Sequence, residues 1–226
     1  MIVVVGLPAY ADGPDGEQCA GGLAVEVAAA ARRRGGTVEL VGKVGNDGAG
    51  DAVVVALGRL GVGHAALLRD PARFTPVLTT VPGNDAVDAA DAADAADAAT
   101  DGPQVRLLPE DAAARPVLEA EDVELALRYL PQASVIVLAD SLPEATVEAG
   151  IQGAAFAEAR LVVLVPAGGA APSVPPETTV LEAPQEDDGS FGRLVGTFAG
   201  ALEAGVDPAA AFREAVATSG WESVPD

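Results

Sequence analysis

The chain alternates short runs of aliphatic, mostly β-branched residues with longer stretches of helical periodicity, and this alternation restricts the fold more than any other feature. Runs typical of buried strands occupy residues 2–5, 37–45, 134–140 and 160–168. Helical patterns are predicted at residues 23–34, 51–61, 121–133, 143–159, 193–203 and 208–218. Strands separated by helices favour a doubly wound, mostly parallel sheet flanked by helices, with ligands bound at the carboxyl ends of the strands.

The remaining segments are predicted to connect these elements within a single α/β domain, residues 1–226. Residues 73–82 and 103–109 are strand-like, and Asp51 is expected at or near the N-cap of the helix over residues 51–61. Between the two strand-like runs, residues 85–102 carry a repeated D-A-A motif that gives no apolar face, so we expect an acidic, solvated loop. Residues 171–188 are rich in proline and acids and are predicted to be irregular.

The charge balance excludes some classes of partner. With 34 acids against 13 bases, the formal net charge is −21. Nucleic acid and anionic membrane surfaces are bound through clustered Lys and Arg, so we expect neither as a partner. No run approaches the ~18 apolar residues of a membrane helix, and the one cysteine, Cys19, cannot form an internal disulfide. These features predict a cytoplasmic protein.

Two segments together resemble a known family. The first is GGLAVEVAAAARRRGGTVELVGKVGNDGAGD, residues 21–51, in which a glycine pair and a helix lead to a strand and a V-G-x-D-x-x-G turn. The second is GSFGRLVGTFAGALEAGVD, residues 189–207. In this order they resemble the two signatures of the ribokinase/PfkB family of carbohydrate kinases. The resemblance implies a ribokinase-like fold and, in an active member, phosphorylation of a sugar or other small alcohol with ATP and Mg²⁺ as cofactors.

The second signature departs from the family at its catalytic position. In the family it reads G-A-G-D, and the Asp takes the proton of the sugar hydroxyl. Aligning Gly189 with the first glycine places Phe191 at the second glycine and Gly192 at the Asp. Glycine has no side chain to accept a proton, so no catalytic base is predicted there. Gly189, Ser190 and Gly192 remain as the anion-hole or nucleotide-binding turn, and the Phe191 ring is expected to crowd it.

The expected sugar-binding residues follow the family only in part. Gly21 and Gly22 match the glycine pair and would allow close approach of a ligand to the backbone. Glu26 stands where the family has a sugar-contacting Asn, and Asp12 is a displaced substitute for a sugar-contacting Asp. An exposed helix acid and an ordinary turn residue are the alternative interpretations of Glu26 and Asp12.

Two intervals are shorter than the family requires. Only ten residues, 11–20, lie where the family builds a β-structured lid, so the lid is predicted to be missing. Only twenty residues, 169–188, lie where the family builds part of the nucleotide side, which is predicted to be partly missing too. Glu186 weakly matches the family's magnesium motif. It lies next to Asp187 and Asp188, and all three acids favour the following helix start themselves.

These departures predict a PfkB-type carbohydrate kinase-like protein that is catalytically impaired or inactive, with a binding or structural role. The alternative is an ATP-dependent kinase that uses Asp187 or Asp188 as its base, with ATP and Mg²⁺ as cofactors. A third hypothesis is binding of a sugar or nucleoside without turnover, through Asp12, Gly21 and Gly22. Self-association into a homo-oligomer is also expected to be possible, through an exposed apolar face or strand edge.

Overall fold

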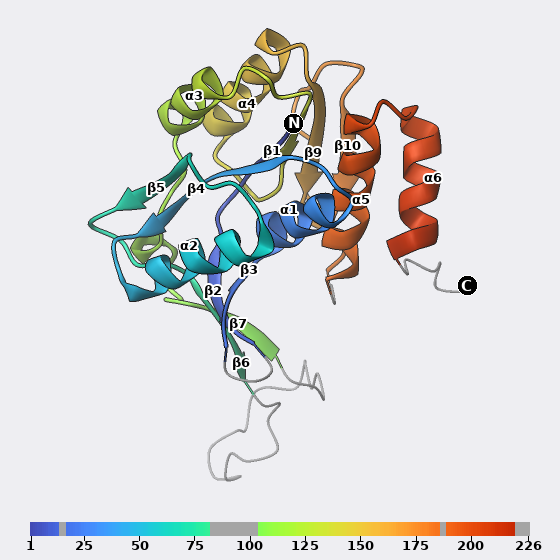
Figure 1. Cartoon of the computed structure of the whole chain (residues 1–226). Coiled ribbons are helices and arrows are strands. Elements are labelled where there is room, and N and C mark those ends of the chain that lie inside the picture. The colour runs from blue at the N-terminus through green and yellow to red at the C-terminus, as the bar shows by residue number, and fades with distance from the viewer. Residues whose placement is uncertain (14–16, 82–103, 186–188, 220–226) are drawn as a thin grey trace, which may run out of the picture.

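The computed structural model describes residues 1–13, 17–81, 104–185 and 189–219. Its larger sheet has six strands in the order β10-β9-β8-β1-β4-β5, and neighbouring strands are parallel throughout. Their bounds are β1 (Ile2–Val5), β4 (Val38–Gly45), β5 (Leu67–Asp70), β8 (Val135–Leu138), β9 (Arg160–Val165) and β10 (Thr179–Glu182). The predicted mostly parallel sheet with flanking helices is confirmed (Figure 1).

Helices cover both faces of this sheet. Their bounds are α1 (Leu23–Arg33), α2 (Gly48–Leu60), α3 (Ala120–Tyr129), α4 (Glu144–Phe156), α5 (Ser190–Glu203) and α6 (Pro208–Ser219), with a 3₁₀ turn at Ala112–Ala114. Successive strand residues point to opposite faces, so Ile2 and Val4 pack in the core under α1, α2, α5 and α6, while Val3 and Val5 pack under α3 and α4. Figure 1 shows α3 and α4 on one side of the sheet and α1 and α2 on the other.

A second sheet corrects one prediction. Strands β2 (Ala9–Asp12), β3 (Gln18–Gly21), β6 (Val77–Val81) and β7 (Gln104–Leu108) form a four-stranded sheet in the order β3-β2-β6-β7, which extends below the main body in Figure 1. The prediction that the chain is too short for a β-structured lid is therefore wrong. Residues 11–20, where the lid was expected to be missing, lie within the β2–β3 hairpin. The other two strands come from a distant hairpin, and β2 joins the two by pairing with β6.

Two smaller predictions are also corrected, and one strand was not predicted. The segment 171–188 was predicted to be irregular, but β10 lies inside it and pairs with β9 at the sheet edge. Helix α2 begins earlier than expected, because Asp47 rather than Asp51 is its N-cap and accepts the Gly50 N–H at 2.8 Å. The sequence patterns did not predict β5, which pairs with β4 at the other edge. The acidic segment 85–102 lies outside the described residues.

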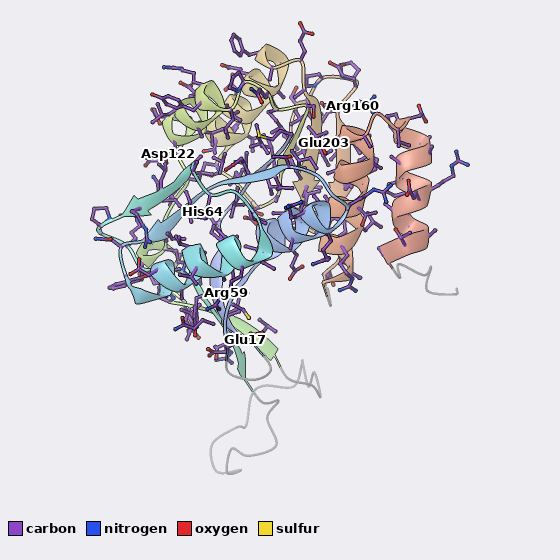
Figure 2. All side chains as sticks on the ribbon, viewed as in Figure 1. Glu17, Arg59, His64, Asp122, Arg160 and Glu203 are labelled. Carbon is purple, nitrogen blue, oxygen red and sulfur yellow. The ribbon has the colours of Figure 1, made fainter. Side chains whose placement is uncertain are left out.

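The start of β1 and the end of α5 lie together at the end of the larger sheet where its parallel strands begin. The amino group of Met1, beside the start of β1, forms an ion pair of 2.8 Å with Glu203 at the end of α5, which is labelled in Figure 2. Met1 also bonds to Ser134, just before β8. Helix α5 thus runs against the strands, and its first turn lies near their carboxyl ends. A doubly wound sheet binds its ligands at the carboxyl ends of its strands.

Candidate functional site

The candidate site lies where the chain reverses its direction of travel across the sheet. From β1 the chain moves to β4 on one side, and it returns later to β8 on the other, so the carboxyl ends of β1 and β8 flank the topological switch point. Crevices form at such points because the connecting segments leave in opposite directions. Gly6 and Leu7 follow β1 here, and Asp140 follows β8.

Asp140 is the principal ionisable group at this switch point. Its Oδ2 accepts the Leu7 N–H at 2.6 Å. A Cβ at Gly6 would lie 2.4 Å from the same oxygen, so only glycine fits beside it. Burial penalises the charged carboxylate more than the Leu7 hydrogen bond favours it, and it raises the pKa of Asp140 to about 6. Sequence reasoning placed residues 134–140 in a buried strand but did not select Asp140, although an acid directly after such a strand was the available signal.

Two hollows meet at Asp140 and Ser141. The larger, here called the α4 hollow, has a volume of about 740 Å³ and lies between α4 and the chain after β9. The smaller, of about 170 Å³, reaches Leu23 at the start of α1 and Ala183 after β10. Together they form a crevice along the carboxyl ends of β8 and β9.

Gly192, to which the resemblance assigns the family's catalytic Asp, is closely packed. A Cβ at Gly192 would lie 2.6 Å from the Cβ of Glu26 and 2.7 Å from its Oε2. A side chain at position 192 would therefore require Glu26, on α1, to move. Gly196 and Gly200 continue this close approach, because Cβ atoms there would lie 2.4 Å from the Val27 carbonyl oxygen and 2.9 Å from the Arg34 Cδ. One row of glycines on α5 thus packs against α1.

The start of α5 combines a glycine turn with an acid from another helix. Gly189 is the N-cap with φ 82°, a left-handed conformation that suits glycine. A Cβ at Gly189 would lie 3.5 Å from the Glu26 Oε2, so this carboxylate lies beside the first turn of α5. A negative charge at this end of a helix is favourable. Ser190 is the first helical residue, and Phe191 is buried in the hydrophobic core.

The acids that precede this helix start cannot be placed. Glu186, Asp187 and Asp188 lie outside the described residues, so the predicted magnesium contact of Glu186 and the predicted acidic approach remain predictions.

The structure separates the other predicted sugar-binding residues. Asp12 is exposed at the far end of the β2–β3 hairpin, where it accepts the Tyr10 hydroxyl at 2.6 Å. Gly21, at the opposite end of the hairpin, faces Ala9 and packs close to β6, since a Cβ there would lie 2.8 Å from the Leu78 Cδ1. Gly22 is the N-cap of α1 with φ 94°. The glycine pair therefore has a structural reason at each position: close packing for Gly21 and backbone conformation for Gly22.

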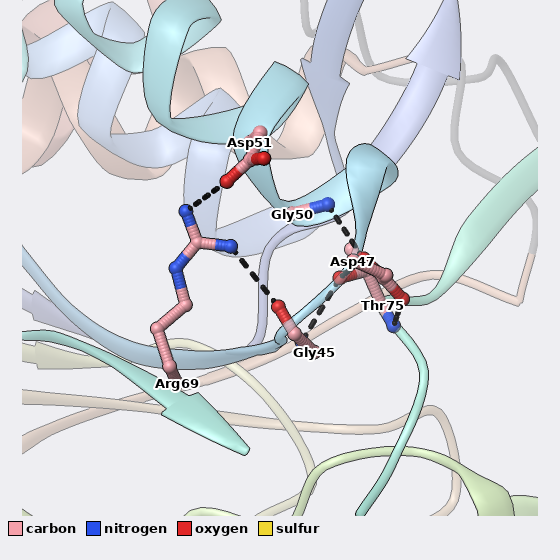
Figure 3. Close-up of polar contacts among 6 residues, drawn as sticks. All are labelled: Gly45, Asp47, Gly50, Asp51, Arg69 and Thr75. Atoms are coloured by element: carbon pink, nitrogen blue, oxygen red, sulfur yellow. Dashed lines mark hydrogen bonds and ion pairs between the residues drawn. The ribbon is translucent and has the colours of Figure 1, made fainter. Parts of the chain in front are cut away.

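The V-G-x-D-x-x-G turn of the first signature forms a hydrogen-bond network that connects β4, α2 and the chain before β6 (Figure 3). Asp47 accepts the Thr75 N–H at 2.9 Å and the Thr75 hydroxyl at 2.6 Å, and the Gly45 N–H donates to Thr75 Oγ1 at 2.9 Å. Burial opposes ionisation of Asp47, but the bonds from Thr75 and Gly50 outweigh it and hold its pKa below the usual range. This motif holds the fold together and contributes no group to the α4 hollow.

The one histidine of the chain, His64, and its one cysteine, Cys19, do not line this crevice. His64 follows α2 and precedes β5, at the edge of the larger sheet opposite β10 (Figure 2). Cys19 is half-buried in β3. The described part of the chain brings together no group of three or more His, Cys, Asp or Glu side chains that could hold a metal ion.

The fold is that of the ribokinase-like sugar kinases. A structure of Arabidopsis thaliana ribokinase complexed with ribose and ATP matches at a TM-score of 0.65 and 14% identity, over 96% of this chain and 90% of that one. A fructokinase from Xylella fastidiosa with bound ATP matches at 0.52 and 17%, over 95% and 68%.

An uncharacterized sugar kinase from Pyrococcus horikoshii matches at a TM-score of 0.51 and 18% identity, over 73% of this chain, which spans about half (52%) of the kinase's own length. No family model and no curated protein sequence matches the chain. At these identities the likeness concerns the fold, and it does not extend to an activity.

The described residues that line the two hollows offer no cationic side chain to a polyphosphate. Neither of the two hollows is lined by Lys or Arg among the residues that the structure describes. Phosphate groups are held by cationic side chains, backbone N–H groups and metal ions. The turn at Gly189 has one group of each charge beside it, since a Cβ there would lie 3.4 Å from the Arg193 Nη1 and 3.5 Å from the Glu26 Oε2.

The α4 hollow opens beside α4 on one face of the larger sheet, and the α1–α5 contact lies on the other. Among the residues placed by the structure, no helix is long and apolar enough to span a bilayer.

Proposed function

We propose that this chain is a ribokinase-fold protein that binds a small molecule at the carboxyl ends of β1 and β8 without efficient phosphoryl transfer. The observation that carries the proposal is the contact between Gly192 and Glu26, with Oε2 lying 2.7 Å from the Cβ position of residue 192. The resemblance assigns the base to this position. Glycine supplies no base, and the neighbouring helix leaves no room for one.

The electrostatics of the crevice support the same proposal. Transfer of a phosphoryl group requires positive charge or directed N–H groups around the phosphates. The hollows are lined by carboxylates and apolar side chains instead. A ligand that carries hydroxyl or other hydrogen-bonding groups on an apolar body, such as a sugar or nucleoside, suits this lining better than a polyanion.

Calorimetry with Mg²⁺-ATP, together with a thermal-shift screen of sugars and nucleosides, tests the proposal. We expect no heat of ATP binding at ligand concentrations up to the millimolar range. We also expect at least one neutral or cationic small molecule to raise the melting temperature. Magnesium-dependent ATP binding, followed by a phosphorylated acceptor in a mass-spectrometric assay, would contradict it.

The second candidate is an ATP-dependent kinase of a sugar or other small alcohol, and Asp140 favours it. A carboxyl group with a pKa near 6 at the ligand edge of the sheet is suited to accept a proton near neutral pH. If this candidate holds, Asp140→Asn abolishes ATP-dependent turnover of the acceptor while leaving the fold intact. Turnover that survives Asp140→Asn would rule out Asp140 as the base.

A further inference from the structure

The two most exposed large apolar side chains among the described residues lie on neighbouring helices. Tyr129 ends α3 with 78% of its surface exposed, and Phe156 ends α4 with 81% exposed. The last turns of the two helices pack together, because a Cβ at Gly153 on α4 would lie 2.2 Å from the Leu127 Cδ1 on α3 (Figure 1). Exposed apolar residues are ordinary when they are scattered, whereas neighbouring ones form a patch that marks an interaction surface.

A hollow opens on the side of α3 that faces away from α4. It lies between α3 and the start of β5, has a volume of about 410 Å³, and is here called the α3–β5 hollow. Among the described residues its lining is apolar except for Asp122, whose carboxylate is paired with Lys43. Leu125, which is 48% exposed, and Tyr129 form part of its rim. An apolar cavity of about 150 Å³ is enough to hold benzene, so this hollow has room for a phenylalanine ring.

The distribution of charge favours a second copy of the chain as the occupant of this face. Residues 129–139 and 149–157 contain no charged residue, although 21% of the chain is charged. Arg128 and Glu158 border these two segments with opposite charges. Two copies that each carry −21 repel one another, and a neutral apolar face is where they can meet with the least repulsion. A basic partner would find more acids to pair with almost anywhere else on the surface.

We propose that two copies of this chain associate through this face about a twofold axis close to Tyr129. Helix α4 packs on β8 and β9, and the α3–β5 hollow lies toward the opposite edge of the sheet, so α3 stands between the hollow and Phe156. A twofold axis at α3 therefore places Phe156 of each copy at the α3–β5 hollow of the other copy. The two Tyr129 rings then meet near the axis.

The location and size of this contact set its expected strength. The ends of α3 and α4 lead into the starts of β8 and β9, where the Arg160 N–H donates to the Ser134 carbonyl oxygen at 3.0 Å. The contact thus lies at the opposite end of the strands from the crevice, and the inference does not depend on the proposed function. An aromatic side chain can bury about 150–250 Å², so four rings supply roughly 600–1,000 Å², just below the ~1,200 Å² of small stable interfaces. We therefore expect a reversible dimer with a dissociation constant on the order of 10–100 μM.

Sedimentation velocity of the full chain from about 5 to 500 μM measures this equilibrium. The average mass should rise from that of one chain toward that of two. The dimer fraction should also increase between about 0.01 and 0.2 M NaCl, because salt screens the repulsion between the copies. A monomer at every concentration would overturn the proposal, and so would a dimer that salt dissociates, since ion pairs would then hold it.

Two matched double variants localise the contact. Tyr129→Ser with Phe156→Ser removes two exposed apolar side chains from the face, and Phe74→Ser with Val105→Ser removes two from elsewhere, exposed to 62% and 67%. Circular dichroism first confirms that both variants fold. The first variant should remain a monomer at about 500 μM, and the second should dimerise like wild type. Equal loss in both variants, or loss in the second alone, would overturn the assignment of this face.

Cross-linking tests the twofold arrangement itself. In a Cys19→Ser background, one chain carries Phe156→Cys and another carries Ala65→Cys, at the α3–β5 hollow. Mild oxidation of the mixture should form a disulfide-linked dimer of the two different chains, because each Phe156 position meets the hollow of the other copy. Chains that cross-link as readily alone as in the mixture would contradict the arrangement.

Discussion

At the scale of single residues, two acids, Glu26 and Asp140, determine the character of the candidate site. Glu26 extends beside the first turn of α5 and occupies the space that a side chain at position 192 would use. Asp140 borders both hollows of the crevice, and its pKa is raised to about 6. Glu26 occupies the space beside Gly192, where the resemblance places the base. Asp140 brings a titratable carboxyl group, which the sequence did not predict, to the carboxyl ends of the strands.

Asp140 should make the stability of the fold depend on pH in a defined window. Its pKa is raised from 3.8 to about 6, so the folded state holds a proton that the unfolded state has released between these values. Stability therefore falls as the pH rises from about 4 to 6, by roughly 3 kcal/mol in total for this group, and stays reduced above pH 6.

Urea denaturation of wild type and Asp140→Asn across this window measures the contribution. The variant keeps an acceptor for the Leu7 N–H and has no charge to bury. We expect equal stability of the two proteins near pH 4 and a more stable variant at pH 7–8. A difference in stability that does not change with pH would contradict the assignment.

At the scale of elements, the contact between α1 and α5 organises one face of the sheet. Gly192, Gly196 and Gly200 lie four residues apart and let α5 approach the α1 backbone closely. Sequence periodicity predicted both helices, but it did not predict that the glycines of the second signature serve this packing. The family comparison had assigned the first of them to a catalytic position.

Adding one methyl group to this contact should be destabilising. A Cβ at Gly196 would lie 2.4 Å from the Val27 carbonyl oxygen, so Gly196→Ala requires a backbone shift and should cost about 1–3 kcal/mol. Gly58→Ala is the matched control, since its Cβ on α2 meets nothing closer than 4.0 Å. Because alanine favours helix over glycine, the control should gain about 0.5–1 kcal/mol. Denaturation curves in which Gly196→Ala is also stabilised would show that α1 and α5 are not closely packed.

The elements that sequence patterns did not predict are short and depend on distant partners. Strands β2, β3, β5 and β10 have four residues each, and none is a continuous apolar run like the equally short β1 and β8. Each exists because another segment presents a strand edge to it. The small sheet in particular requires β2 to meet β6 across a long stretch of sequence. The continuously apolar strands and the amphipathic helices could be predicted without knowledge of their partners.

At the scale of the whole molecule, the net charge of −21 means that folding concentrates negative charge. Self-repulsion destabilises a compact state, and salt weakens it over the Debye length, which falls from about 30 Å at 0.01 M to about 10 Å at 0.1 M. The acidic composition is thus a property of the whole molecule that no single element explains.

Low concentrations of salt should therefore stabilise the chain. We expect the melting temperature to rise between about 0.01 and 0.2 M NaCl, by roughly 2–4 °C for each kcal/mol of relieved repulsion, and to change less above that range. Scanning calorimetry in NaCl and in KCl measures it, and the two salts should give similar curves because screening depends on ionic strength. A melting temperature that is constant below 0.2 M would contradict this account.

The amino-acid sequence by itself determined the class of fold. Buried strands and amphipathic helices require apolar residues at regular positions, and these positions can be recognised in the sequence. It also showed that position 192 has no side chain to act as a base. Only the tertiary structure decided that Glu26 fills that position, that Asp140 reaches the switch point, and that distant hairpins join in a second sheet. Those outcomes depend on which segments meet in space, and contacts between distant residues leave no period in the sequence.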